Sequence, residues 1–169
     1  MNDWLLIPVV ILLLLLVRLI RQQAVFIPLP INTVKKILRT AQIKQDDILY
    51  DLGAGDGRVL ITASIEYGIR AIGIEKNKLL AWIIKMRIKR NRLTSKSKVV
   101  NGDLFKQDLS NASIIVVYLT QKMNDILQPK LKKELKQGTT VISAAHIFKG
   151  WKEYEKIKTG HFYTYFYKT

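Results

Sequence analysis

From Asp47 onward the sequence alternates between short apolar runs and longer amphipathic stretches, and this alternation restricts the fold more than any other feature. Short β-branched runs between turn residues predict buried strands, and amphipathic stretches predict helices. Repeated strand–helix units imply a parallel sheet that helices cover on both faces. We expect strands at 48–52, 71–74, 98–100, 114–119 and 139–143, and helices at 58–67, 79–90 and 122–135, the last with a kink or restart at Pro129.

The last stretch of the chain departs from this alternation. Residues 151–157 and 162–167 flank Thr159-Gly160, and the alternating pattern HFYTYFYK is typical of a strand. We therefore expect an antiparallel hairpin at the end of the sheet. The predicted fold class is α/β. The expected layout resembles the Rossmann-like seven-strand sheet of class I methyltransferases, mostly parallel with an antiparallel C-terminal hairpin, and is preceded by one N-terminal hydrophobic helix.

Ahead of the sheet lies an apolar segment at residues 4–20, which has no charge before Arg18. A membrane-spanning helix needs about 20 such residues, and this segment reaches the lower limit if Arg18 extends its charge to the lipid headgroups. A signal peptide is one alternative, but its first residues should be positively charged, whereas this chain has the acidic Asp3 there. No small-residue cleavage site follows the apolar segment either. An interfacial helix is the other. We expect residues 4–20 to contact the lipid bilayer as a single-pass anchor.

Positive residues follow the apolar segment, at Arg18, Arg21, Lys35 and Lys36. The positive-inside tendency then predicts a membrane protein whose remaining chain lies on the cytoplasmic side. Two prolines next predict an extended connector, followed by a helix at 33–41 that Asn32 caps. The predicted division of the chain is an anchor helix at 1–22, a connector with its helix at 23–46 and the α/β domain at 47–169.

One loop combines glycines with acidic residues where the first predicted strand passes into a helix: Asp51-Leu52-Gly53-Ala54-Gly55-Asp56-Gly57-Arg58. Open α/β sheets bind ligands at the carboxyl ends of their strands, and glycines let a ligand approach the backbone. A dinucleotide site requires a third glycine at position 58, which is Arg58, and the Gly-Lys pair of a P-loop is also missing. Asp51 instead suits a cationic group, such as the α-amino group of S-adenosylmethionine.

Two further acidic residues end the next two predicted strands. Glu75 can accept hydrogen bonds from both hydroxyls of a ribose, and Asp103 lies within reach of an adenine amino group. A solvated strand end explains each residue taken singly, but acids at three successive strand ends indicate one crevice. The residues expected to bind the cofactor are Asp51, Gly53, Ala54, Gly55, Asp56, Gly57, Glu75, Lys76, Asp103 and Leu104.

The composition limits the remaining chemistry. Cysteine is absent and the histidines are His146 and His161, so we expect no disulfide, no cysteine nucleophile and no metal site. Lys and Arg outnumber Asp and Glu by 28 to 13, giving a formal net charge of +15 that favours anionic partners. The basic residues of the helix at 79–93 are interpreted as its solvent face, with lipid or RNA contact as the alternative: Lys85, Arg87, Lys89 and Arg90.

In several short blocks of residues the sequence resembles the small seven-strand protein-lysine methyltransferases. This family includes mitochondrial enzymes that act on adenine nucleotide translocase and on the membrane ring of ATP synthase, and a broad-specificity archaeal enzyme. The resemblance runs from about residue 26 to residue 151. It rests on Phe26-Ile27-Pro28-Leu29-Pro30, the block 51–58, Gly73-Ile74-Glu75-Lys76-Asn77, Gly102-Asp103-Leu104-Phe105-Lys106, Val116-Val117-Tyr118-Leu119 and the helix 123–135. It implies S-adenosylmethionine as cofactor and methyl transfer to lysine side chains of a protein, which we expect to be membrane-associated.

The resemblance also implies an acceptor pocket after the fourth strand. The Asn-Pro-Pro-Tyr of methyltransferases that act on base or glutamine amino groups is replaced by Val117-Tyr118-Leu119-Thr120-Gln121, which makes Tyr118 the expected catalytic residue. The expected walls of the substrate pocket are Phe26, Pro28, Phe148 and Trp151, although a core position explains the aromatic ones as well.

Two departures from the family pattern leave the substrate open. Leu29 lies between the two prolines, where a small polar residue is common, and Ala145-His146-Ile147 replaces an Arg-Phe-Pro stretch. Two other hypotheses therefore stand beside protein-lysine methylation. The chain could methylate RNA or a small molecule, since its positive charge permits nucleic acid as a partner although we do not favour it. It could also be a cofactor-binding membrane protein without catalysis.

Overall fold

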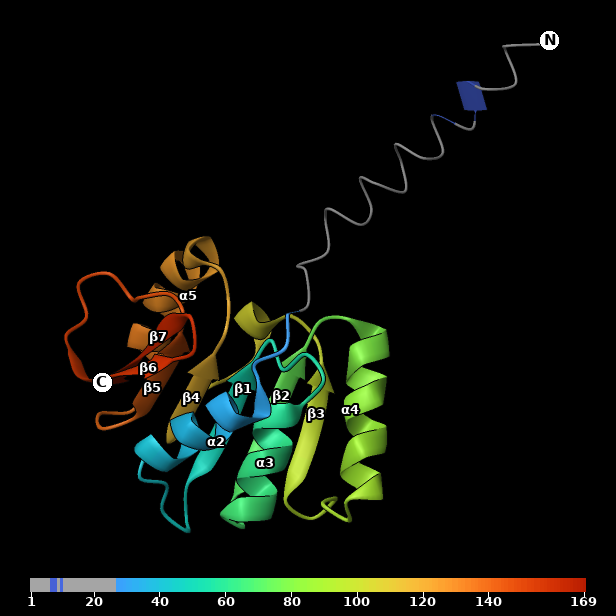
Figure 1. The fold of residues 1–169 in the computed structure, drawn as a ribbon, viewed down its shortest axis with the longest axis horizontal. Coiled ribbons are helices and arrows are strands. Elements are labelled where there is room, and N and C mark those ends of the chain that lie inside the picture. The colour runs from blue at the N-terminus through green and yellow to red at the C-terminus, as the bar shows by residue number, and fades with distance from the viewer. Residues whose placement is uncertain (1–6, 9, 11–26) are drawn as a thin grey trace.

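The computed structural model describes residues 7–8, 10 and 27–169 of the chain. Its centre is a sheet of β1 (Ile48–Leu52), β2 (Arg70–Glu75), β3 (Ser97–Asn101), β4 (Ile114–Val117), β5 (Thr140–Ala144), β6 (Glu153–Thr159) and β7 (Phe162–Lys168). The order across the sheet is β3-β2-β1-β4-β5-β7-β6 (Figure 1). Strands β1 to β5 are parallel, and β7 is antiparallel to β5 and β6. The predicted seven-strand sheet with its C-terminal hairpin is confirmed.

The described helices are α2 (Ile31–Thr40), α3 (Arg58–Glu66), α4 (Lys78–Arg90), the short 3-10 helix η2 (Leu104–Lys106) and α5 (Gln121–Glu134). Side-chain caps begin two of the α-helices. The Asn77 side chain accepts hydrogen bonds from the first turn of α4, and the Thr120 hydroxyl accepts one from the first turn of α5. Helix α2 starts directly after Pro30, so Asn32 lies within its first turn instead of capping it.

Two other boundaries differ from the predictions. Strand β4 ends at Val117, so Tyr118 and Leu119 belong to the loop that follows it and not to the sheet. Helix α5 continues without interruption through Pro129, so the predicted restart there does not occur. The first difference matters for the site, because residues in the loop after a strand can face a ligand that the strand itself cannot reach.

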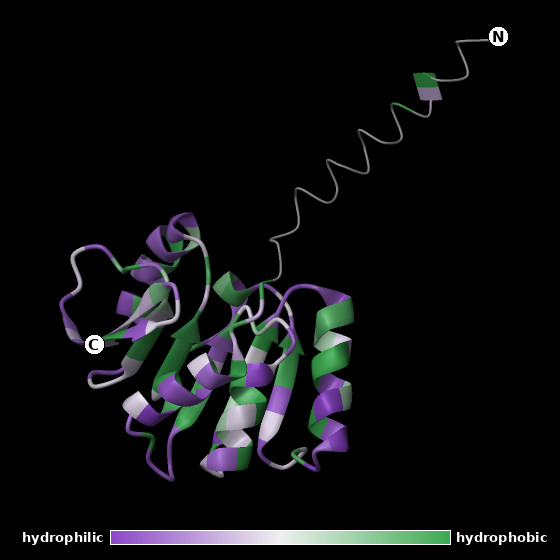
Figure 2. Ribbon diagram, viewed as in Figure 1, coloured by the Kyte–Doolittle hydropathy of each residue, from purple (hydrophilic) through white to green (hydrophobic). Residues whose placement is uncertain are grey.

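The central strands β1, β4 and β5 are buried on both faces, and their side chains alternate between two hydrophobic cores. In β1, Leu49 packs into the first core and Leu52 into the second. Residues of α2, α3 and α4 complete the first core, and residues of α5 complete the second. Figure 2 shows the result, hydrophobic central strands between helices that carry hydrophilic residues. Both faces of the sheet are thus occupied by packing, and a ligand site is expected at the strand ends.

Gly73 allows α3 to pack closely on β2. A Cβ atom at Gly73 would lie 2.5 Å from Leu60 Cδ2 and 2.9 Å from the Cβ of Ala54. We expect Gly73→Ala to lower the free energy of unfolding by about 1–3 kcal/mol, because overpacking forces side chains and backbone to shift. Denaturant unfolding measures this loss. Gly102→Ala is the matched control, since its Cβ would meet only the flexible end of the Gln107 side chain, at 3.1 Å. Equal losses in both variants would contradict the packing argument.

The predicted membrane localisation needs correction. Among residues 7–8, 10 and 27–169, no helix is long and apolar enough to cross a membrane. The longest helix of this part, α5, has 14 residues, whereas a span needs about 20. The prediction of a single-pass membrane protein with its domain on the cytoplasmic side is therefore wrong for the described chain. The apolar segment at 4–20 and the anchor at 1–22 lie, apart from residues 7, 8 and 10, outside the described residues.

Candidate functional site

The glycine loop, residues 53–57, follows β1 at the centre of the sheet. The backbone N–H of Gly53 donates to the carbonyl oxygen of Ile74 at 2.9 Å, which ties the loop to the end of β2. The φ angles of Gly53, Gly55 and Gly57 are 81°, 58° and 78°. Residues with a side chain rarely adopt this left-handed region, so the three glycines are required for the path of the loop.

Asp51 is a buried carboxylate directly ahead of this loop. Its Oδ2 atom is buried, and among the described residues no donor lies within hydrogen-bond distance of it. Burial, followed by the nearby charges of Glu75 and Asp56, raises the pKa of Asp51 to about 7, although a hydrogen bond from the Leu60 backbone acts in the opposite direction. A buried acid without a donor for one oxygen fits a cationic ligand group, which would supply both the hydrogen bond and the opposite charge.

Glu75 joins the glycine loop to the segment after β2. One carboxylate oxygen accepts a hydrogen bond from the backbone N–H of Gly55, and the other accepts one from the backbone N–H of Asn77, both at 2.8 Å. The residue is 8% exposed. Asp51, the glycines and Glu75, which the sequence predicts to share one crevice, are therefore in one place. Because an ionised carboxylate can accept about four hydrogen bonds, Glu75 has capacity left for ligand hydroxyls.

The other predicted cofactor residues at the strand ends form the rim of this site. Asp103 Oδ1 accepts a hydrogen bond from the backbone N–H of Phe105 at 3.0 Å, and its Oδ2 lies 3.5 Å from Lys76 Nζ. Leu104 is buried in the second core. Asp103 follows Gly102, whose backbone N–H donates to the carbonyl oxygen of Glu75 at 3.0 Å. Within the described part of the chain, no group of three His, Cys, Asp or Glu residues is arranged to hold a metal ion.

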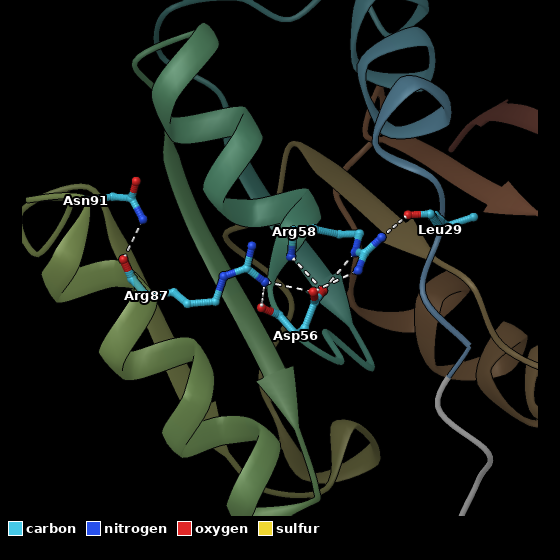
Figure 3. Close-up of polar contacts among 5 residues, drawn as sticks. All are labelled: Leu29, Asp56, Arg58, Arg87 and Asn91. Carbon is cyan, nitrogen blue, oxygen red and sulfur yellow. Dashed lines mark hydrogen bonds and ion pairs between the residues drawn. The ribbon is translucent and has the colours of Figure 1, made fainter.

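Asp56 belongs to the glycine loop, but its side chain points to two arginines (Figure 3). Arg58 Nε lies 2.9 Å from Oδ1, and Arg87 Nη1 lies 2.7 Å from Oδ2. Burial alone would raise the pKa of Asp56, but the hydrogen bond and charge of Arg58 and the charge of Arg87 outweigh burial and hold it below its ordinary value. The prediction that Arg87 lies on a solvent face misses this contact, and the sequence contains no sign of it, because 31 residues separate Arg87 from Asp56.

The loop after β4 contacts the glycine loop. A Cβ atom at Gly53 would lie 2.9 Å from Leu119 Cδ2, so the two loops touch. The neighbouring Tyr118 is half-buried, and its ring stacks on Phe162 of β7 with the centroids 5.6 Å apart. The predicted catalytic residue is thus part of an aromatic wall next to the loop that is expected to hold the cofactor.

The predicted walls of the substrate pocket are not all near Tyr118. Phe148 and Trp151 pack against each other in the second core, with centroids 5.2 Å apart, whereas Tyr118 packs against the first core. Pro28 is exposed in the connector ahead of α2. Phe26 lies outside the described residues. Tyr118 thus lies one residue before Leu119, which touches the glycine loop, whereas Phe148 and Trp151 pack into the core on the other face of the sheet.

A polar stripe on α5 fixes the loop after β5, and the sequence analysis missed it. The amide nitrogens of Gln121, Asn124 and Gln128 donate to the carbonyl oxygens of residues 147, 146 and 149. Lys149 adds an ion pair with Asp125, at 2.9 Å. The spacing of three and four residues places these amides on one face of α5, a signal that was available in the sequence. The loop at 146–149 is thereby held beside the start of α5 and next to the loop after β4.

The strand order, the glycine loop after β1 and the acid at the end of β2 together define a class I, Rossmann-like methyltransferase. The chain belongs to the family of the ANTKMT methyltransferase domain, whose model matches residues 51–155. It is a methyltransferase that uses S-adenosylmethionine as its cofactor. The predicted family, enzyme class and cofactor are confirmed.

Two curated relatives show the range of the similarity. A protein-lysine N-methyltransferase of Saccharolobus islandicus (strain REY15A) is 39% identical over 134 residues, which cover 79% of this chain and 83% of the relative. An adenine nucleotide translocase lysine N-methyltransferase of Mus musculus is 30% identical over 104 residues, which cover 61% of this chain and 45% of the relative. The match thus spans about half the length of this second relative.

Solved structures support the same fold. An RNA methyltransferase from Salinibacter ruber, in complex with S-adenosyl-L-homocysteine, is 31% identical with a TM-score of 0.82. The match covers 84% of this chain and 93% of that one. A methyltransferase from Geobacter sulfurreducens, also in complex with S-adenosyl-L-homocysteine, has a TM-score of 0.60 at 16% identity. This match covers 73% of this chain and 51% of the Geobacter chain. At that identity the second likeness shows the fold alone.

Proposed function

We propose that this chain transfers methyl groups from S-adenosylmethionine to lysine side chains of a protein. The observation that carries the proposal is the stacked pair of Tyr118 and Phe162, in which Tyr118 directly precedes Leu119, the residue that touches the glycine loop at Gly53. It is supported by the 39% identity to a protein-lysine methyltransferase over most of both chains. The finer prediction of a membrane-associated acceptor protein stays a prediction.

The proposed cofactor contacts follow from the charges at the strand ends. Asp51 would bind the ammonium group of the methionine part, since its buried oxygen without a donor requires a cation or a hydrogen-bond donor. Glu75 would accept hydrogen bonds from the ribose hydroxyls while it keeps its two hydrogen bonds from backbone N–H groups. Asp103 at the rim would accept a hydrogen bond from the adenine amino group. The bound cofactor supplies the activated methyl group, and the protein aligns the acceptor with it.

The acceptor side must take up a lysine and allow it to lose its proton. An aromatic ring favours the ammonium ion as it enters, through attraction between the cation and the ring face. Partial burial next to the ring then lowers the pKa of that ammonium, because the charged form is desolvated. Tyr118 and Phe162 provide such a surface, and neither role requires a strong base from the protein. The proton passes to water, and the neutral amine that remains can attack the methyl group.

Tyr118 can act through its ring or through its hydroxyl group, and two substitutions distinguish these roles. We expect Tyr118→Ala to lower kcat for a lysine acceptor about tenfold to a hundredfold, because the acceptor loses a positioning wall. Tyr118→Phe keeps the ring stacked on Phe162 and should retain most of the activity if the ring carries the role. Calorimetry with S-adenosyl-L-homocysteine is the control, since neither variant should change cofactor affinity. Full activity of Tyr118→Ala would exclude the residue from the pocket.

RNA methylation is a second candidate function, and one observation favours it. The structure from Salinibacter ruber, at 31% identity over most of both chains, is described as an RNA methyltransferase. The formal net charge of +15 is compatible with nucleic acid as a partner. We favour the lysine acceptor because the Asn-Pro-Pro-Tyr block that serves base amino groups is replaced here from Val117 onward.

The test uses methyl-labelled S-adenosylmethionine, the purified full chain, and protein and RNA fractions from its native cells. Label in a protein band that resists nuclease and yields methyl-lysine on hydrolysis supports the proposal. Label that nuclease removes supports RNA methylation instead. The matched control is Gly55→Arg, since Gly55 is buried at a φ of 58° and an arginine there should block the loop. Label that persists with this variant would come from a contaminating enzyme.

A further inference from the structure

We propose that Arg87 is a positioning residue, which holds the glycine loop through Asp56 in the shape that binds the cofactor. The inference rests on the proposed cofactor site and adds to it a residue from a different element. Figure 3 shows the arrangement, in which Arg87 of α4 and Arg58 of α3 approach Asp56 from two sides. Neither guanidinium group takes part in the methyl transfer itself under this proposal.

Arg87 contacts the loop at two points. Its Nη1 donates to the backbone carbonyl oxygen of Asp56 and to Oδ2 of the same residue, each at 2.7 Å. A bond to the backbone fixes the path of the chain directly, whereas a bond to the side chain alone would leave that path free. Asp56 lies between Gly55 and Gly57, which both have positive φ angles. Glycines are conformationally permissive, so a loop of this kind needs outside contacts to populate one shape.

Arg58 completes the network on the other side. Its Nε and Nη2 each lie 2.9 Å from a different oxygen of Asp56, the two-point geometry that makes arginine–carboxylate pairs directional. Its Nη1 donates to the carbonyl oxygen of Leu29 at 2.5 Å, and the Leu29 side chain is buried in the first core. Asp56 therefore links the connector, the glycine loop and α4, and its carboxylate is engaged by arginines instead of facing a ligand.

The environment of the network makes it more than a surface ion pair. The side chain of Asp56 is 19% exposed, and those of Arg58 and Arg87 are 27% and 39% exposed. Partial burial reduces screening by water and salt, and several bonds share one carboxylate. The arginines hold the pKa of Asp56 below its ordinary value, so the carboxylate remains charged throughout the neutral range. A loop held in this way binds its ligand without first having to be ordered.

The test compares Arg87→Met with Arg90→Met, a matched change on an exposed residue of the same helix. Calorimetry with S-adenosyl-L-homocysteine gives the Kd of each variant. We expect Arg87→Met to raise Kd about tenfold, because only a fraction of the molecules would have the competent loop. Arg90→Met should match the wild type. With saturating cofactor, kcat of Arg87→Met should stay within about twofold of the wild type, since the reacting groups are unchanged.

Arg87→Lys is the second variant and decides the matter even if Arg87→Met does not fold. A lysine keeps the charge, but its ammonium ends a shorter side chain than the Nη1 atom that makes both contacts, so an intermediate Kd is expected. An unchanged Kd in every Arg87 variant that folds, with or without a lower melting temperature, would overturn the proposal, as would equal effects of Arg90→Met. A wild-type chain that fails to bind S-adenosyl-L-homocysteine would instead refute the cofactor site, so the two failures are distinguishable.

Discussion

Asp51→Ala is expected to raise the Kd for S-adenosyl-L-homocysteine about a hundredfold or more, and to lower kcat/KM for the cofactor to the same extent. Breaking a buried ion pair by removing one partner costs about 3–5 kcal/mol, and each factor of ten in affinity corresponds to about 1.4 kcal/mol. The ligand group concerned is the ammonium, which would lie buried beside an apolar strand end without its counter-charge.

Asp51→Asn is expected to stabilise the cofactor-free chain while it weakens cofactor binding. The pKa of Asp51 is raised from 3.8 to about 7, with burial as the largest cause. Between these two pH values the folded chain keeps a proton that the unfolded chain has released. The free energy of unfolding therefore falls as the pH rises through this window. The full destabilisation, up to about 4 kcal/mol, is reached above about pH 7. An asparagine at this position carries no charge, so Asp51→Asn avoids this destabilisation.

The measurement is a pair of melting curves for wild type and Asp51→Asn without cofactor. At about pH 8 the variant should melt several degrees higher, since about 1 kcal/mol moves the melting temperature by 2–4 °C in a chain of this size. At about pH 4.5, only slightly above the ordinary pKa of 3.8, the difference should shrink to about a quarter of its value at about pH 8. A variant that melts lower at both pH values would show that Asp51 serves the fold. A higher melting temperature together with a lost affinity would identify it as a binding residue that is costly to the fold.

The fold could be predicted from the sequence because the strands are short, apolar and regularly spaced. The predicted bounds of β1 match the structure, and those of the other parallel strands differ by one or two residues, since burial on both faces requires apolar runs. The end of β4 was misplaced. Tyr118 and Leu119 continue the apolar run Ile114–Val117, and nothing in their residue types shows that the chain leaves the sheet there.

Part of the site could be predicted for a similar reason. Asp51, the glycines and Glu75 follow directly after predicted strands, and a parallel sheet brings its strand ends to one edge. The contact between Arg87 and Asp56 was not predictable in this way. It joins a helix to a loop through side chains 31 residues apart, and a basic residue on an amphipathic helix is compatible with solvent exposure as well. Its sequence neighbours Lys85 and Lys89 are indeed exposed.

Phe148 and Trp151 illustrate a different limit. Aromatic residues after β5 are compatible with a substrate pocket or with the core, and the sequence does not fix the face of the sheet on which they lie. In the structure Phe148 packs edge-on against Tyr167 of β7, with centroids 5.8 Å apart, beneath α5. The position depends on how the α5 amides hold the loop at 146–149, which is a tertiary contact.

Glu75→Ala is the other substitution with a large expected effect, because Glu75 has two functions. It holds the backbone N–H of the buried Gly55, and it is the proposed acceptor for the ribose hydroxyls. Removal leaves the buried N–H without its acceptor, which should lower the free energy of unfolding by about 1–3 kcal/mol. The Kd for S-adenosyl-L-homocysteine should rise about a hundredfold, since the ligand loses hydrogen bonds to a charged group and the loop loses one of its hydrogen bonds to β2.

Glu134→Ala separates these two effects. Glu134 also accepts a hydrogen bond from a backbone N–H, that of Leu109 at 3.1 Å, but it lies at the end of α5 away from the glycine loop. Its removal should lower stability to a similar extent and leave Kd unchanged. Unfolding curves and calorimetry on both variants give the comparison. If Glu75→Ala loses stability but binds the cofactor as tightly as Glu134→Ala does, Glu75 only supports the loop, and the ribose must be bound by other residues.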